Sequence, residues 1–261
     1  MRLAVGTDEV YVYTGARALA PSRASIVFVH GAANDHSVWS LQSRYFAHHG
    51  RNVLAVDLPG HGRSTGAPLE SVEAIAQWLV HVLDAAGVEH ASLVGHSLGS
   101  LAVLEAAARA PARVDRIALL GPAVPMAVSE ALMDAARRDD HVAYELIVGW
   151  SHSAAGQLGG NPVPGMWMTG TALRLMERTR PGGLAVDLGA CASYANGLDA
   201  ARALRCPALV VTGSRDLMAP AKSAEALIGA LNGPRVVTLA CGHAMMAEQP
   251  DEVLDALRAF L

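Results

Sequence analysis

The sequence predicts an α/β fold with a mostly parallel, doubly wound sheet and helices on both of its faces. Short apolar runs rich in β-branched residues alternate with helical patterns over residues 1–122, and this alternation returns over residues 205–261. Such alternation is typical of parallel sheets, whose strands are buried on both sides. The irregular segment between the two regular parts, residues 123–204, predicts a helical cap inserted late in the chain.

The predicted strands follow a regular order. Residues 1–14 alternate loosely between apolar and polar side chains, which predicts an antiparallel hairpin at the edge of the sheet. The later runs are short and apolar, as expected of buried parallel strands. They span residues 25–29, 52–56, 91–95, 117–120, 207–213 and 235–239.

The helices are predicted from apolar residues at helical spacing and from the signals at their ends. Ser71 is the expected N-cap of a helix that ends near Gly87, and Pro250 opens the closing helix. The other core helices are expected over residues 41–49, 100–108 and 222–231. The cap helices are expected over residues 130–138, 142–150, 171–177 and 184–194. Residues 1–122 and 205–261 should therefore form one core domain, with 123–204 as its cap.

Bulk composition narrows the class of protein. The 261 residues are 52% hydrophobic and carry a formal net charge of −4, so one domain with a sizeable core is expected. The absence of a basic stripe argues against nucleic acid as a partner. No apolar run reaches the roughly 18 residues that span a bilayer, and the first residues lack the apolar centre of a signal peptide. We expect a cytoplasmic protein with a small-molecule substrate and no membrane partner, either monomer or homodimer.

Cysteine and histidine usage indicates neither disulfides nor a metal. Cys191, Cys206 and Cys241 are scattered and odd in number, which predicts reduced, mostly buried thiols. Cys241 lies two residues before a histidine of interest, so it is also a candidate for the lining of a site. None of the 11 histidines falls in a zinc-binding pattern, and the glycines of residues 57–64 lack dinucleotide spacing. We therefore expect no cofactor and no metal.

The strongest local signal is the segment 91–108, in which a predicted strand is followed by Gly95-His96-Ser97-Leu98-Gly99 and a predicted helix. A serine in such a sharp strand-to-helix turn is held clear of the sheet, and the small residues beside it let strand and helix approach closely. The helix N-terminus favours negative charge beside Ser97. The G-x-S-x-G pattern alone is weak evidence in a chain with 25 glycines, so its partners decide its meaning.

A nucleophilic serine needs a base within hydrogen-bond reach, and the base needs an anion that orients it. Loops at the ends of predicted parallel strands supply Ser97, Asp216 and His243, in that chain order. Functional groups of such sheets collect beyond the carboxyl ends of the strands. We therefore expect these three side chains to meet at one edge of the sheet.

Further motifs make the sequence resemble the α/β-hydrolase superfamily, in its serine hydrolase, carboxylesterase-like branch. The matching segments are His30-Gly31, residues 57–64, residues 95–99, residues 213–216 with Pro220, and Gly242-His243. This likeness spans nearly the whole chain and is weakest in the cap. Serine at position 97 argues against the haloalkane dehalogenases and epoxide hydrolases of this fold, which use a carboxylate nucleophile.

The resemblance implies a role for each of these residues. Ser97 would attack a carbonyl carbon, His243 would take its proton, and Asp216 would orient the imidazole. The backbone N–H groups of Ala32 and Leu98 would form an oxyanion hole.

Other residues compete for these roles. Asp57 is the main alternative to Asp216, and His61 and His96 are the alternatives to His243. All three lie in loops where a packing or hydrogen-bonding role is the simpler interpretation.

Candidates for the substrate pocket come from the loop after the first parallel strand and from the large side chains of the cap. If the cap faces the site, the side chains on its lower face line the pocket. Methionine and tryptophan at helical spacing are equally expected in the core of the cap. The candidates are Asn34, His36, Trp39, Met126, Trp150 and Trp167.

Several activities fit this arrangement. The leading interpretation is hydrolysis of a carboxylic ester or lactone of a small, largely apolar substrate through an acyl-Ser97 intermediate. A C–C bond hydrolase of ring-cleavage products would need a basic pocket, and a solvated helix face is the simpler interpretation of its candidates. Those candidates are Arg137, Arg138, Arg174 and Arg178. Acyl transfer to an alcohol or peroxide and a ligand receptor without turnover stay open, because fold does not determine function.

Overall fold

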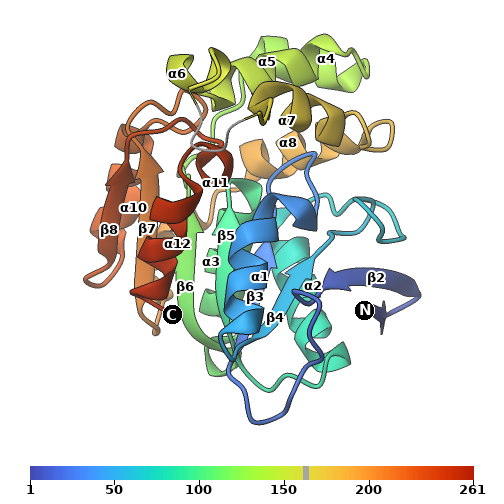
Figure 1. The fold of residues 1–261 in the computed structure, drawn as a ribbon, viewed down its shortest axis with the longest axis vertical. Coiled ribbons are helices and arrows are strands. Elements are labelled where there is room, and N and C mark those ends of the chain that lie inside the picture. Colours follow the sequence, from blue (N-terminus) through green and yellow to red (C-terminus); the bar gives the residue numbers. More distant parts are fainter. Residues whose placement is uncertain (161–164) are drawn as a thin grey trace.

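The computed structural model describes residues 1–160 and 165–261, and Figure 1 shows their arrangement. The strands are β1 (Arg2–Val5), β2 (Asp8–Tyr13), β3 (Ser25–Val29), β4 (Asn52–Val56), β5 (Ala91–His96), β6 (Val114–Leu120), β7 (Ala208–Gly213) and β8 (Arg235–Leu239). The core helices are α1 (Ser40–His48), α2 (Val72–Ala85), α3 (Leu98–Arg109), α9 (Gly197–Ala203), α10 (Glu225–Ala230), α11 (Met245–Glu248) and α12 (Pro250–Arg258). Those above the sheet are α4 (Glu130–Arg137), α5 (Val142–Ser151), α6 (Ala154–Gln157), α7 (Met168–Met176) and α8 (Gly183–Ser193). Short 3₁₀ helices are η1 (His36–Trp39), η2 (Pro111–Arg113) and η3 (Ala221–Ala224).

The described strands form one sheet in the order β1-β2-β4-β3-β5-β6-β7-β8. Strands β1 and β2 form an antiparallel hairpin, and β2 is also antiparallel to β4. From β4 to β8 every neighbouring pair is parallel. The mostly parallel sheet with an edge hairpin is therefore confirmed, and the carboxyl ends of β3, β5, β7 and β8 meet at one edge.

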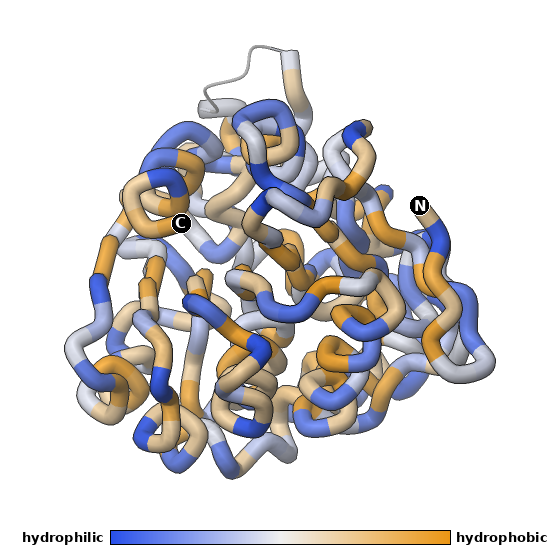
Figure 2. Tube along the Cα trace, turned by 90° about the horizontal axis from the view of Figure 1, so that it is seen from below, coloured by the Kyte–Doolittle hydropathy of each residue, from blue (hydrophilic) through white to orange (hydrophobic). Residues whose placement is uncertain are grey.

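Helices cover both faces of this sheet, as predicted (Figure 1). Within β3, Ile26 and Phe28 join the apolar cluster under α1 and α12, whereas Val27 and Val29 join the cluster under α2 and α3. Both faces of the strand are buried, which explains its continuous apolar sequence. Figure 2 shows the hydrophobic stretches running mainly through the interior, with hydrophilic segments at the surrounding loops.

The end signals of α2 behave as predicted. The Ser71 hydroxyl accepts a hydrogen bond from the Ala74 amide, and Gly87, which follows the C-cap residue Ala86, has a left-handed φ of 64°. A serine at the N-cap satisfies an amide that has no partner inside the helix, and glycine adopts a left-handed φ without strain.

The helices α4 to α8 lie over the carboxyl edge of the sheet (Figure 1). Leu132, Ile147, Met176 and Leu188 join an apolar cluster of their own there. Helix α9 packs against α3 and α10. The boundaries of a cap over residues 123–204 stay a prediction, and residues 161–164 of that segment lie outside the described chain. Among the described residues, no helix has the length and apolar character needed to cross a bilayer.

The differences in element bounds have local causes. Strand β6 begins at Val114, before the predicted start at residue 117. The prediction missed its first residues because the exposed side chains of Asp115 and Arg116 interrupt the apolar pattern. Helix α9 was not predicted, since 7 residues are too few to show helical periodicity. The predicted helix over residues 222–231 is divided into η3 and α10.

Two glycines let the start of α3 pack closely beside Ser97, since Gly95 permits its contact with β5 and Gly99 its contact with the end of β3. A Cβ atom on Gly95 would lie 2.7 Å from the Ser100 amide nitrogen and still closer to the Gly99 carbonyl group. A Cβ atom on Gly99 would lie 2.6 Å from the His30 carbonyl oxygen. Neither position has room for a side chain without a backbone shift.

We expect Gly95→Ala to lower the free energy of unfolding by about 3 kcal/mol, near the upper end of the cost of overpacking a core. Urea unfolding measures the change. The control is Gly229→Ala in α10, where an added Cβ meets open space and should raise stability by up to about 1 kcal/mol. Wild-type stability in Gly95→Ala would contradict the close packing of this turn.

Candidate active site

Ser97 lies between the end of β5 and the start of α3, with φ 54° and ψ −119°. A left-handed φ costs a non-glycine residue about 1–3 kcal/mol, so the surroundings must hold it. The Ser97 amide donates to the Leu120 carbonyl at 2.9 Å. Its carbonyl accepts from the Ser100 amide at 2.8 Å and from the Ser100 hydroxyl at 2.6 Å. These bonds fix the backbone of a serine that borders the main cavity.

The loop after β3 lies against this serine. A Cβ atom on Gly31 would lie 3.1 Å from Ser97 Cβ, so glycine permits the approach. The Gly31 carbonyl accepts from His30 Nδ1 at 2.8 Å and from the Asn34 amide at 3.3 Å. Because N–H and C=O of a trans peptide point in opposite directions, the Ala32 N–H points away from these two donors.

The two amides implicated in an oxyanion hole are both available. Leu98 is the first residue of α3, where amides have no partner inside the helix. Within residues 1–160 and 165–261, neither the Ala32 nor the Leu98 amide donates a hydrogen bond. Ala32 itself borders the cavity.

His243 and Asp216 follow β8 and β7 at the same edge. His243 Nδ1 lies 2.7 Å from Asp216 Oδ2, and both side chains are buried. Asp216 Oδ1 accepts from the amides of Met218 and Ala219, each at 2.8 Å. Because a carboxylate only accepts, Nδ1 carries the proton and the neutral imidazole has an unprotonated Nε2.

Neighbouring groups hold the His243 ring. His96 Nε2 donates to the His243 carbonyl at 2.9 Å, and the two ring centroids are 4.6 Å apart. A Cβ atom on Gly121, whose φ is 58°, would lie 2.8 Å from His243 Cε1. His96 therefore supports the loop of His243.

Ser97 and His243 line the same cavity. In the part of the chain that the structure describes, the Ser97 hydroxyl and the His243 ring form no direct hydrogen bond. Catalytic hydrogen bonds often shorten only when substrate binds. The structure thus brings the three predicted side chains to one edge, with one of the two expected hydrogen bonds formed.

The cavity has a volume of about 700 Å³, within the usual range for a small-molecule site. Of the predicted pocket residues, Asn34, Met126 and Trp150 border it. Among the described residues, its lining contains no Asp, Glu, Lys or Arg. Its methionines are Met126, Met166, Met168, Met176, Met218 and Met246.

The other predicted pocket residues lie elsewhere. Trp39 is fully buried against Phe28, with ring centroids 5.2 Å apart, because η1 turns its apolar side toward the sheet. Trp167 is 71% exposed and borders a smaller surface pocket together with Arg174 and Arg178. Neither tryptophan belongs to the described lining of the main cavity. Cys241 is also outside that lining, and burial raises its pKa to about 12.

The four arginines considered for a basic pocket lie outside the described lining of the cavity. Arg137, Arg138 and Arg174 are exposed and pair with neighbouring acids of their own segments. Arg178 lies 3.6 Å from Asp35. None of them belongs to the main cavity among the described residues.

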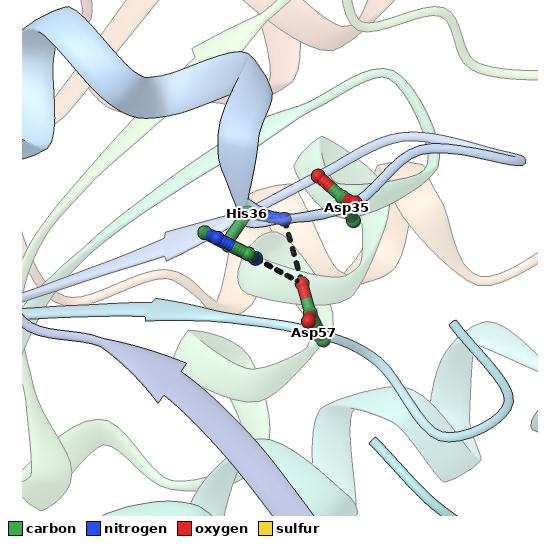
Figure 3. Close-up of side chains that lie close together, drawn as sticks. All are labelled: Asp35, His36 and Asp57. Carbon is green, nitrogen blue, oxygen red and sulfur yellow. Dashed lines mark hydrogen bonds and ion pairs between the residues drawn. The ribbon is translucent and has the colours of Figure 1, made fainter. Parts of the chain in front are cut away.

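Asp57, the alternative acid, belongs to a different cluster. Figure 3 shows Asp35, His36 and Asp57, whose ligand-type atoms lie within 4.8 Å of one another. Asp57 Oδ1 accepts from the amide and from Nδ1 of His36, both at 2.7 Å, and Oδ2 accepts from the Arg63 amide. Although burial opposes it, these hydrogen bonds lower the pKa of Asp57. Asp57 therefore joins the loops after β3 and β4 and has no contact with His243.

A family model described as alpha/beta hydrolase fold matches residues 24–250, which include the Ser97 turn and the loops of Asp216 and His243. The chain belongs to the α/β-hydrolase fold family. The family resemblance predicted from the motifs is confirmed, and the matched relatives support a hydrolase.

Three similar proteins illustrate the range of this family. The chain is 27% identical over 251 residues to (E)-2-((N-methylformamido)methylene)succinate hydrolase of Acinetobacter baylyi, covering 90% of this chain and 89% of the relative. It is 29% identical over 255 residues to pyrrolizixenacetamide deacetylase of Xenorhabdus hominickii, covering 90% of each. The crystal structure of the enol-lactonase from Burkholderia xenovorans superimposes with a TM-score of 0.90 at 23% identity, covering 100% of this chain and 99% of that one. At 23% identity, this superposition shows that the two proteins share a fold.

Two buried carboxylates of this α/β-hydrolase were missed by the sequence analysis. Glu248 in α11 accepts from the amides of Gly242 and Ser153, at 2.9 and 3.1 Å, and from the Ser153 hydroxyl. It joins the His243 loop to the end of α5. Asp187 in α8 accepts from the Ala33 amide at 2.9 Å. A single acid within the apolar run of α8 is a signal of a buried acceptor, whereas the short helix α11 gave none.

His30 is a buried neutral imidazole. It precedes residues 31–34, which hold the candidate oxyanion donor Ala32 and are called the oxyanion loop below. Its Nδ1 donates to the Gly31 carbonyl and its Nε2 accepts from the Leu58 amide at 3.1 Å. Burial, together with the nearby His61, lowers the pKa of His30 to about 4. Burial and the nearby His243 also lower the pKa of His96 well below its ordinary value.

The depressed pKa of His30 predicts a loss of stability in mild acid. Unfolding frees this imidazole to bind a proton near pH 6.5, so its contribution is complete above that pH and is lost as pH falls toward 4. At pH 5, His30 alone should lower the free energy of unfolding by about 2 kcal/mol relative to pH 7. Urea unfolding at both pH values tests this, with His30→Gln expected to show a drop smaller by that amount. The same drop in both proteins would exclude His30 as the cause.

Proposed function

We propose that this α/β-hydrolase cleaves carboxylic esters or lactones of small, largely apolar substrates through an acyl-Ser97 intermediate. One observation supports this above all. The strained Ser97 turn, the imidazole of the His243–Asp216 pair and the Ala32 loop border a single cavity. The described lining of that cavity holds no charged carboxylate, lysine or arginine, which favours an uncharged acyl group.

In the acylation step, Ser97 Oγ bonds to the carbonyl carbon and its proton passes to His243 Nε2. Asp216 keeps the Nδ1 proton in place and stabilises the imidazolium. The carbonyl oxygen becomes an oxyanion that accepts from the amides of Ala32 and Leu98. Each such donor contributes about 10²–10³ in rate. Collapse of the intermediate breaks the bond between the carbonyl carbon and the alcohol oxygen, which takes the proton from His243 and leaves acyl-Ser97. An ester releases its alcohol at this step, whereas the hydroxyl of an opened lactone stays attached to the acyl group.

Deacylation repeats this sequence with water as the nucleophile. His243 takes a proton from the water as its oxygen bonds to the acyl carbon, and then returns the proton to Ser97 Oγ as the ester bond breaks. The carboxylic acid leaves and the enzyme is restored. The same two amides serve both tetrahedral intermediates.

The cavity chemistry separates this proposal from the main alternative. A C–C bond hydrolase of carboxylate-bearing ring-cleavage products would need a cation in the pocket, and the four cap arginines lie outside its described lining. The name of the relative from Xenorhabdus hominickii, a deacetylase, is consistent with the removal of an acyl group.

Ser97→Ala should lower kcat for p-nitrophenyl butyrate by about 10⁴-fold or more, because the nucleophile is removed. Release of p-nitrophenolate measures the rate. A fluorophosphonate should label wild-type protein at Ser97, which peptide mass spectrometry locates, and should leave the variant unlabelled.

The exposed serine at the end of α8 provides the control, since Ser193→Ala should keep both turnover and labelling at Ser97. Full activity in Ser97→Ala would contradict the acyl-enzyme. Tight binding of butyrate esters with no turnover by wild-type protein would favour a receptor.

A further inference from the structure

We propose that Asp187 is a positioning residue for the oxyanion loop, so that the Ala32 amide is correctly oriented only while α8 is seated on the core. This inference rests on the proposed function, because it assigns a task to the same site. Asp187 lies on α8 above the sheet, whereas Ala32 and Ala33 follow β3.

The contacts of Asp187 are direct and buried. Only 2% of Asp187 is exposed, and its Oδ2 accepts from the Ala33 amide at 2.9 Å. The Ala33 carbonyl accepts from the hydroxyl of Thr179, in the turn between α7 and α8, at 3.3 Å. Both polar backbone groups of Ala33 are therefore bound by the segment that lies over the site.

Ala33 needs this support because its φ is 54°, a left-handed value that strains an alanine. The peptide before it is fixed at its other end, where the Ala32 carbonyl accepts from Asn34 Nδ2 at 3.1 Å. Without the bond to Asp187, the turn at Ala33 could relax to an unstrained φ. Relaxation would rotate the two peptides on either side of Ala33. The one that follows carries the Asn34 amide, which donates to the Gly31 carbonyl at 3.3 Å and so helps to hold the peptide that presents the Ala32 N–H.

Asp187 is itself held in place by a buried cation. His61 Nε2 lies 2.8 Å from Asp187 Oδ2, and His61 Nδ1 lies 3.0 Å from the Pro59 carbonyl. Both ring nitrogens face acceptors, so both carry protons and the imidazole is charged. Burial opposes this charge, but the Asp187 carboxylate outweighs it and raises the pKa of His61.

The test compares Asp187→Asn and Asp187→Ala with a matched buried carboxylate. Glu105 in α3 accepts from the Tyr194 hydroxyl and Asn196 Nδ2, beyond the end of α8, and has no contact with the oxyanion loop. Glu105→Gln is therefore the control for the loss of a buried charge. For each protein, kcat and KM are measured with p-nitrophenyl butyrate, Tm by thermal unfolding, and Ki with butylboronic acid. The boronic acid forms a tetrahedral adduct with the Ser97 hydroxyl and so reports on the oxyanion hole.

In Asp187→Asn, the carboxamide oxygen can take the place of Oδ2 and accept from both Ala33 and His61. A neutral oxygen binds both donors less strongly than the carboxylate does. We expect kcat to fall about tenfold in Asp187→Asn and about 100-fold in Asp187→Ala, within the range for a weakened or lost oxyanion donor. KM should change less than about twofold, and Ki for the boronic acid should rise by the same factor as kcat falls. Glu105→Gln should have a lower Tm than wild-type protein, with kcat and Ki unchanged.

Distinct results overturn the two proposals. If wild-type protein neither hydrolyses the ester nor reacts at Ser97, the proposed function fails and this inference fails with it. If wild-type protein is active, an unchanged Ki in Asp187→Asn, or an equal loss of kcat in Glu105→Gln, overturns the positioning role alone. If Asp187→Ala does not fold, kcat and Ki of the Asp187→Asn variant test the positioning role.

Discussion

The geometry of the site depends on the close backbone approach of three segments at glycines. Gly99 brings the start of α3 against the His30 carbonyl, Gly95 brings β5 against α3, and Gly31 brings the loop after β3 against Ser97. The strained φ of Ser97 is tolerated because these contacts leave the backbone no alternative path. Backbone packing at these glycines therefore sets how closely the loop after β3 approaches Ser97.

The segment above the sheet supports the loops of the candidate site and also forms part of the cavity wall. Glu248 and the turn at Ser153 hold the amide of Gly242, next to His243, while Asp187 holds Ala33, next to Ala32. The loops of Ala32 and His243 are thus each bound by a buried carboxylate at a junction with this segment. A buried acceptor that satisfies an amide is costly to remove, so both loops keep one shape while the surrounding helices stay packed.

The sequence predicted the core of the site because parallel topology places strand ends together. Once residues 91–95, 207–213 and 235–239 were identified as strands, Ser97, Asp216 and His243 had to follow them at one edge. The pocket was harder to predict, since periodicity does not tell which neighbour a helix faces. Trp39 and Trp150 both belong to apolar patterns. Trp39 is nevertheless fully buried against the sheet, whereas Trp150 borders the cavity. Asp187 was visible as an acid in an apolar run, but its partners come from residues more than a hundred positions away.

The charge of His61 also bears on the chemistry at Ala32. A carboxylate that accepts from the Ala33 amide lies one peptide from the group that would meet a developing oxyanion, and an unpaired negative charge there would oppose it. The imidazolium of His61 pairs with the same oxygen of Asp187, so the buried pair has no net charge. Asp187 can therefore hold the loop by a strong hydrogen bond while the oxyanion experiences mainly the N–H dipoles. A neutral acceptor at position 187 would avoid the repulsion but would bind the Ala33 amide less strongly, since charged acceptors make the stronger hydrogen bonds.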